Sequence, residues 1–126
     1  MSQEKILVVD DEVILVDLIK IRLEAKGYAV MTANDGLEGL SKARQGRPDL
    51  IILDIGMAQM DGYTMLKEVR KSPKIKDTPV IMLTASGKMR DLFEVEGISD
   101  YIVKPFDTED FLARVENVLR QGKMIP

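Results

Sequence analysis

The sequence predicts an α/β protein: a doubly wound, five-stranded parallel sheet with helices on both faces. Two observations support this fold class. Short, continuous runs of apolar and β-branched residues recur along the chain, which is typical of parallel strands buried on both faces. Longer amphipathic stretches alternate strictly with these runs, and right-handed crossovers then wind such a chain into an open sheet.

The expected elements form five strand–helix pairs in chain order. The apolar runs are Ile6 to Val9, Tyr28 to Ala33, Leu50 to Leu53, Val80 to Leu83 and Tyr101 to Val103. The amphipathic stretches lie at about Glu12 to Lys26, Leu37 to Arg44, Tyr63 to Lys71, Arg90 to Glu96 and Thr108 to Gln121.

Local signals at the ends of these elements agree with the boundaries. Gly27 stands where a helix often ends in a residue of positive φ. Asp35 and Glu38 have the spacing of a capping box, and Asp107 precedes the last helix as an N-cap residue would. Three prolines fall at strand edges or in loops, where a missing N–H costs least: Pro48, Pro79 and Pro105.

Length and composition indicate one globular domain. The 126 residues, 45% hydrophobic and 31% charged, are enough for one core and too few for a second separate domain, so residues 1–126 are expected to fold as one unit. The N-terminus, Met-Ser-Gln-Glu-Lys, is not a signal peptide, and no apolar stretch is long enough to span a bilayer. We expect a cytoplasmic protein with no membrane contact.

Charge and missing residue types exclude several kinds of chemistry. The net charge of -3 and the scattered lysines provide no basic stripe, so direct contact with nucleic acid is not expected. The absence of cysteine excludes disulfides and thiolate catalysis. The absence of histidine removes the commonest metal ligand and general base, so any metal must be held by oxygen.

Polar residues follow the predicted strands at the edge where doubly wound sheets bind their ligands. They are Asp10 and Asp11 after the first run, Asp54 after the third, Thr84 after the fourth and Lys104 after the fifth. Three crowded carboxylates repel one another unless a cation neutralises them, and oxygen ligands favour Mg²⁺, with Mn²⁺ as the alternative. A carboxylate can accept a phosphoryl group whose other oxygens bind lysine, hydroxyl and metal. The set therefore predicts a phosphoryl–magnesium site.

Each of these residues, taken singly, also has an ordinary structural interpretation. Asp10 and Asp11 suit a helix N-terminus, and Asp54 suits a turn. Thr84 suits the end of a strand, and Lys104 suits an exposed surface. Only their conjunction at one edge of the sheet favours the chemical interpretation.

Several segments resemble the receiver domains of bacterial two-component response regulators, over nearly the whole chain. The matching segments are Ile6 to Glu12, Asp49 to Asp54, Met60 to Gly62, Pro79 to Ala85 and Asp100 to Phe106. The resemblance is to the stand-alone, chemotaxis-regulator-like members, and it implies a flavodoxin-like sheet with strand order 2-1-3-4-5.

The resemblance also implies how a metal is held. It makes Asp54 the phospho-acceptor and a direct ligand of Mg²⁺, together with Asp11. Asp10 would act partly through water, and the backbone carbonyl of Gly56 would complete the protein's share of the ligands.

A second group of residues is implied to bind the phosphoryl group and to respond to it. Thr84 and Lys104 would contact the phosphoryl oxygens, small Ala85 would leave an open approach, and the peptide bond to Pro105 would be cis. Phosphorylation would draw Thr84 toward the phosphoryl group and Tyr101 inward. This change would alter partner binding at the face of the fourth helix, fifth strand and fifth helix.

The implied function is a phosphorylation-activated signalling switch, and no enzyme beyond its own phosphorylation and dephosphorylation. The donor would be a phosphohistidine on a sensor histidine kinase or a phosphotransfer protein, since this chain has no histidine. The downstream protein is unknown, and the chain is expected as a monomer or a phosphorylation-dependent dimer.

Some positions depart from the family pattern. Ala58 stands where proline is usual, which predicts a more mobile loop, and the interval from Thr84 to Gly97 is shorter than usual, which affects the partner-binding face. Gly56 and Ser86 offer no carboxylate or amide to position water, so we expect no strong acceleration of phosphoryl hydrolysis.

Three other functions compete with this one. The first is a pseudo-receiver that binds partners without phosphorylation, supported only by the departures above. The second is an aspartate-nucleophile phosphohydrolase, which needs a second acid where this chain has Gly56. The third is a flavodoxin-like cofactor carrier, whose phosphate-binding loop would need glycine and backbone N–H groups where this chain is acidic.

Overall fold

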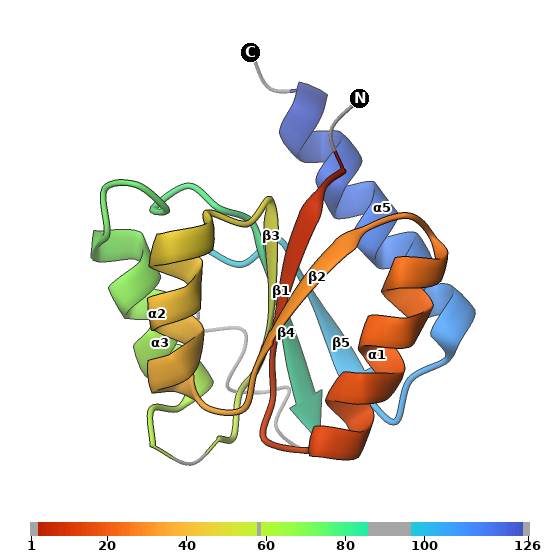
Figure 1. Ribbon diagram of the computed structural model, residues 1–126, viewed down its shortest axis with the longest axis horizontal. Coiled ribbons are helices and arrows are strands. Elements are labelled where there is room, and N and C mark those ends of the chain that lie inside the picture. Colours follow the sequence, from red (N-terminus) through yellow and green to blue (C-terminus); the bar gives the residue numbers. More distant parts are fainter. Residues whose placement is uncertain (1–2, 58, 86–96, 125–126) are drawn as a thin grey trace.

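The computed structural model describes residues 3–57, 59–85 and 97–124, and Figure 1 shows a central sheet between two layers of helices. The strands are β1 (Lys5–Val9), β2 (Ala29–Ala33), β3 (Leu50–Asp54), β4 (Val80–Ala85) and β5 (Asp100–Lys104). The helices are α1 (Val13–Ala25), α2 (Gly36–Gly46), α3 (Gly62–Lys71) and α5 (Thr108–Met124). The predicted helix Arg90 to Glu96 lies outside the described residues.

All strand pairs are parallel, and the sheet order is β2-β1-β3-β4-β5, which confirms the predicted fold class and order. The strand ends differ slightly from prediction. The third, fourth and fifth strands were expected to stop before Asp54, Thr84 and Lys104, whereas the observed strands include these residues. The reason is that the pairing continues past the apolar runs, with Asp54 opposite Leu83 and Ala85 opposite Lys104.

Two hydrophobic cores lie on the two faces of the sheet. Along β1, Leu7 and Val9 belong to the core beneath α2 and α3, while Ile6 and Val8 belong to the core beneath α1 and α5. This alternation follows from the two-residue period of a strand, and all four side chains are fully buried. Both faces are therefore covered, as the continuous apolar runs predicted.

Helix termini confirm the predicted caps. The Asp35 carboxylate accepts a hydrogen bond from Glu38 N at 2.8 Å, while the Glu38 side chain accepts one from Asn34 N at 2.7 Å. This is a capping box whose return arm reaches one residue further back than usual. Asp107 accepts from Asp110 N at 3.1 Å, and Gly27 has φ +94°, so both termini form as expected.

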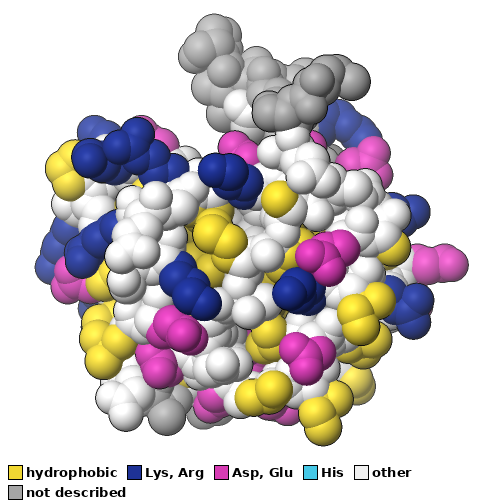
Figure 2. All heavy atoms as spheres, viewed as in Figure 1, with side chains coloured by type: hydrophobic (Ala, Val, Ile, Leu, Met, Phe, Trp, Pro, Cys, Tyr) yellow, Lys and Arg dark blue, Asp and Glu magenta, His cyan; other side chains and the backbone are white. Residues whose placement is uncertain are grey.

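No helix among the described residues is long and apolar enough to cross a membrane. Helix α1 nevertheless exposes several large hydrophobic side chains, with Ile14 86% and Ile21 62% exposed. In Figure 2 yellow side chains gather at the lower right, where Figure 1 draws α1. The opposite face of this helix packs Val16, Ile19 and Leu23 into the core.

Candidate functional site

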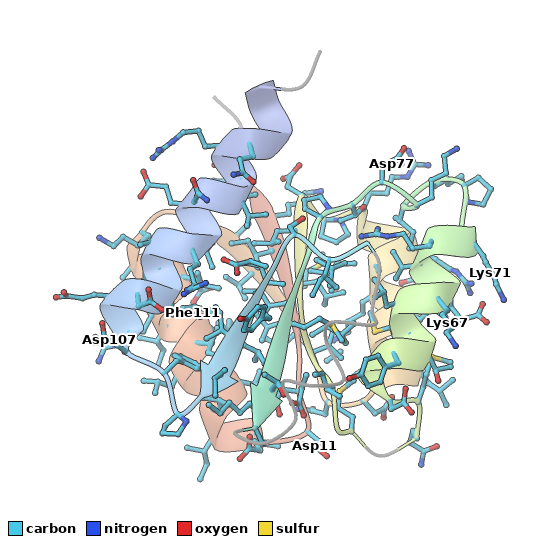
Figure 3. The ribbon with its side chains drawn as sticks, turned by 180° about the vertical axis from the view of Figure 1, so that it is seen from behind. Asp11, Lys67, Lys71, Asp77, Asp107 and Phe111 are labelled. Atoms are coloured by element: carbon cyan, nitrogen blue, oxygen red, sulfur yellow. The ribbon has the colours of Figure 1, made fainter. Side chains whose placement is uncertain are left out.

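Three carboxylates meet at the carboxyl edge of the sheet. Asp10 directly follows β1, Asp11 comes next, and Asp54 is the last residue of β3, which pairs with β1. Carboxylate oxygens of the three lie within 4.8 Å of one another. Figure 3 shows Asp11 at this end of the molecule and Asp77 at the opposite end. An oxygen-only donor set of this kind suits a hard cation such as Mg²⁺ and offers nothing to a softer metal.

Lys104, the last residue of β5, brings an ammonium group to these carboxylates. Its Nζ lies 2.8 Å from Asp10 Oδ2, 2.7 Å from Glu12 Oε2 and 3.3 Å from Asp54 Oδ1. The lysine side chain is 17% exposed, and the Asp10 side chain is fully buried. Asp11 is a fourth acid beside the same site. Lys104 therefore supplies one positive charge among four acids, and the pocket has excess negative charge.

Burial and charge have opposite effects on the two central groups. Burial raises the pKa of the Asp54 carboxyl, the negative charges of Asp10 and Asp11 raise it further, and Lys104 partly opposes them. For Lys104, burial lowers the pKa, but hydrogen bonds to Asp10 and Glu12 outweigh it and the pKa is raised. The lysine thus stays charged, while Asp54 pays an energetic penalty for its charge that a bound cation would relieve.

The segment after β3 holds Asp54 in place. Ile55 N donates to Leu83 O at 3.0 Å, and Gly62 N donates to Ile55 O at 2.9 Å. A Cβ atom on Gly62 would approach the backbone oxygen of Asp54 to 2.4 Å, so only glycine allows this close passage. Asp61 caps α3 by accepting from Thr64 N at 2.8 Å. The Met60–Asp61–Gly62 segment therefore packs α3 directly against the end of β3.

The other predicted site residues are near the pocket but are not all directed at the carboxylates. Gly56, Ala85 and Pro105 line the pocket, and the Lys104–Pro105 peptide bond is cis, as the resemblance implied. Thr84 is fully buried, and its hydroxyl donates to Ala85 O at 3.2 Å, so it is engaged with its own strand. Tyr101 is half-buried and packs against the core beneath α2 and α3.

An apolar wall borders the acidic pocket. Leu15 and Leu18 of α1 and Phe106 after β5 line it together with the acids. Phe106 stacks on Phe111 of α5 with ring centroids 4.9 Å apart, which fixes this side of the wall. The predicted departures at Ala58 and Ser86 lie outside the described residues.

A family profile described as the response regulator receiver domain matches residues 6–116. The chain belongs to this family. It is 43% identical over 124 residues to the "DNA-binding dual master transcriptional regulator RpaA" of Synechocystis, a match that covers 97% of this chain and 52% of that protein. It is 42% identical to the alkaline phosphatase synthesis transcriptional regulatory protein PhoP of Bacillus subtilis, covering 96% of this chain and 50% of that protein.

Solved receiver structures share the fold. The chemotaxis response regulator CheY4 of Vibrio cholerae aligns with a TM-score of 0.87 at 36% identity, covering 93% of this chain and 99% of that chain. A putative response regulator from Chloroflexus aurantiacus aligns with the same TM-score at 35% identity, covering 94% and 99%. This receiver domain is a phosphorylation-activated switch of two-component signalling. It spans about half the length of the curated relatives named above.

Two residues of this receiver site were not predicted from the sequence. Glu12 was expected only as the first residue of a helix and the last residue of a family motif, yet its carboxylate contacts Lys104 from 92 positions away in the chain. Gly62 was predicted only as part of a family motif, and its contact with the end of β3 depends on how α3 packs. Neither role leaves a periodicity or composition signal.

Proposed function

We propose that Asp54 accepts a phosphoryl group from a phosphohistidine of a partner protein, in a reaction that needs Mg²⁺. The observation that carries this proposal is the meeting of Asp10, Asp11 and Asp54 with Lys104 at the carboxyl edge of the sheet. The Asp54 carboxylate oxygen would form a bond to phosphorus while the P–N bond of the donor breaks and its electron pair returns to the imidazole nitrogen. Asp54 is largely buried, at 7% exposed, but it lines the pocket from which the phosphoryl group would approach.

Asp10, Asp11, Asp54 and the Gly56 carbonyl would hold the ion, with Asp10 acting partly through water. The ion would neutralise charge that develops on the transferring phosphoryl group. Lys104 would bind a phosphoryl oxygen, because its Nζ already lies 3.3 Å from Asp54 Oδ1. Thr84 would turn its hydroxyl from Ala85 O to the new phosphoryl oxygens, and Ala85 would leave the approach open.

The output would be a change in partner binding. Movement of Thr84 would free space for Tyr101, which now lies half-buried on β5. The face of the predicted fourth helix, β5 and α5 would then change. The only reactions that the domain would catalyse are its own phosphorylation and dephosphorylation. The donor would be a sensor histidine kinase or a phosphotransfer protein, and the apolar wall beside the pocket suits a protein donor.

We further propose that the domain is cytoplasmic and that it is a monomer or a phosphorylation-dependent dimer. The expectation of no direct contact with nucleic acid applies to residues 1–126 only, since the Synechocystis relative, about twice as long, is named a DNA-binding regulator.

Intact mass tests the acceptor directly. The chain is incubated with a small acyl phosphate, with and without Mg²⁺, and compared with Asp54→Asn. Asp49→Asn is the matched control, since it makes the same substitution just before the same strand. We expect one phosphoryl group on the native chain and on the control, only with Mg²⁺, and none on Asp54→Asn.

Two other outcomes would contradict the proposal and favour a different function. No phosphoryl gain under any condition would favour the pseudo-receiver, which binds partners without phosphorylation. Turnover of a generic phosphomonoester would favour the phosphohydrolase, although Gly56 offers it no general acid.

A further inference from the structure

Glu12 occupies the N-cap position of α1 but does not cap the helix. Its backbone is extended, with φ -85° and ψ 93°, and its side chain makes no hydrogen bond to the first turn. The N-caps of α2 and α3 are Asp35 and Asp61, and each accepts a hydrogen bond from the backbone of its helix. Glutamate is not among the preferred N-cap residues, so helix stability does not explain this side chain.

The Glu12 carboxylate instead reaches across the mouth of the acidic pocket. It lies 2.7 Å from Lys104 Nζ and is 59% exposed, so it approaches the ammonium from the solvent side. Its own N–H donates to Asp10 Oδ1 at 3.0 Å, which fixes the backbone beside the pocket. The two closest partners of the ammonium are therefore Glu12 and Asp10, and Asp54 is the most distant of the three at 3.3 Å.

We propose that Glu12 is a positioning residue that draws the Lys104 ammonium toward the mouth of the pocket and so leaves Asp54 available to bind a cation and to react. This inference rests on the proposed magnesium-dependent function. Without the outer carboxylate, the ammonium would settle between the two buried acids, Asp10 and Asp54, where the attraction is strongest. There it would neutralise the charge that a divalent cation needs, and the cation would have to displace it.

The proposal is tested by Mg²⁺ affinity, measured by isothermal titration calorimetry on native chain, Glu12→Gln, Glu12→Asp and Glu24→Gln. Glu12→Asp keeps the charge, shortens the arm by one methylene, and introduces the residue type that caps α2 and α3. Glu24→Gln makes the same charge change at the exposed far end of α1. We expect Glu12→Gln and Glu12→Asp to weaken Mg²⁺ binding about two- to fivefold, the range for a partly exposed ion pair, and Glu24→Gln to match the native chain.

The rate of phosphoryl gain from a small acyl phosphate provides a second, independent measurement. In both Glu12 variants the Mg²⁺ concentration at half-maximal rate should rise by the same factor as the dissociation constant. Thermal unfolding of each variant checks that the fold is retained.

The proposal is overturned if Glu12→Asp binds Mg²⁺ as the native chain does while Glu12→Gln is weakened, since only charge at the mouth would then matter. Native affinity in both variants, or tighter binding, overturns it too. If the native chain takes up no phosphoryl group at all, the proposed function fails, and the calorimetric comparison still decides the role of Glu12.

Discussion

Strand β3 has an aspartate at each end, and the two are in opposite situations. Asp49, just before the strand, accepts a hydrogen bond from Lys5 N at 2.7 Å, while its own N–H donates to Lys5 O at 2.8 Å. It is exposed, and its charge has a local backbone partner. Asp54, the last residue of the strand, is buried beside two other acids, and burial and their charges raise its pKa.

The same contrast extends over the two ends of the sheet. At the amino end Arg70 donates to the carbonyls of Lys76 at 2.9 Å, of Thr78 at 2.7 Å and of Gly97. A charged guanidinium group thus satisfies three backbone carbonyl oxygens. At the carboxyl end several acids share one ammonium. The hydrogen bonds of Arg70 therefore stabilise the amino end. The crowded acids at the carboxyl end destabilise the fold and favour a bound cation.

The largest stability effect is expected at the amino end. Arg70→Met should lower the free energy of unfolding by about 2 to 3 kcal/mol, because three carbonyl oxygens lose a charged donor. Arg70→Lys keeps the charge but lacks the planar fork of donors, so it should recover less than half of the loss. Urea denaturation measures both, and a loss in Arg70→Met of under about 0.5 kcal/mol would show that water replaces these bonds without cost.

Magnesium should stabilise the carboxyl end. At about ten times its dissociation constant, Mg²⁺ should add about 1.4 kcal/mol to the free energy of unfolding of the native chain. The gain should be smaller in Asp54→Asn, which loses a charged ligand, and unchanged in Asp49→Asn. Thermal unfolding with and without chelator measures this, and an equal gain in all three proteins would place the ion elsewhere.

Removing the charge of Asp54 in the absence of metal should stabilise the protein. Because the folded-state pKa of Asp54 is raised, its ionisation costs stability as the pH rises through that pKa, and the cost is absent below the ordinary value of 3.8. In the presence of chelator at pH 7, Asp54→Asn should therefore be about 1 kcal/mol more stable than the native chain. The difference should vanish in acid. A less stable variant at pH 7 would mean that the pair with Lys104 outweighs the repulsion.

Substitution of Asp49 at the amino end of β3 should destabilise the protein, whereas Asp54→Asn stabilises it, and the effect should be the smallest of the four. Asp49→Ala should lower the free energy of unfolding by about 0.5 kcal/mol, because Lys5 N loses its acceptor at an exposed site where water can replace it. Asp49→Asn keeps an oxygen acceptor and should lie close to the native chain. Stabilisation by either substitution would remove the contrast between the two ends of β3.

Local features were predictable because their causes are local. Gly27, Asp35 and Asp107 act within one helical turn, and the structure confirms each. The strand ends were less predictable, since pairing with a neighbouring strand carries Asp54 and Lys104 into the sheet beyond the apolar runs.

The sequence by itself determined the alternation of strands and helices, and hence which residues arrive at the carboxyl edge, because burial on both faces leaves continuous apolar runs. The family motifs then pointed to a receiver, and the profile match confirmed it. Only the tertiary structure decided that Lys104 binds Asp10 and Glu12 more closely than Asp54, and that Thr84 is engaged with its own strand. Such distances depend on how strands and helices far apart in the chain pack together, and no residue pattern along the chain encodes them.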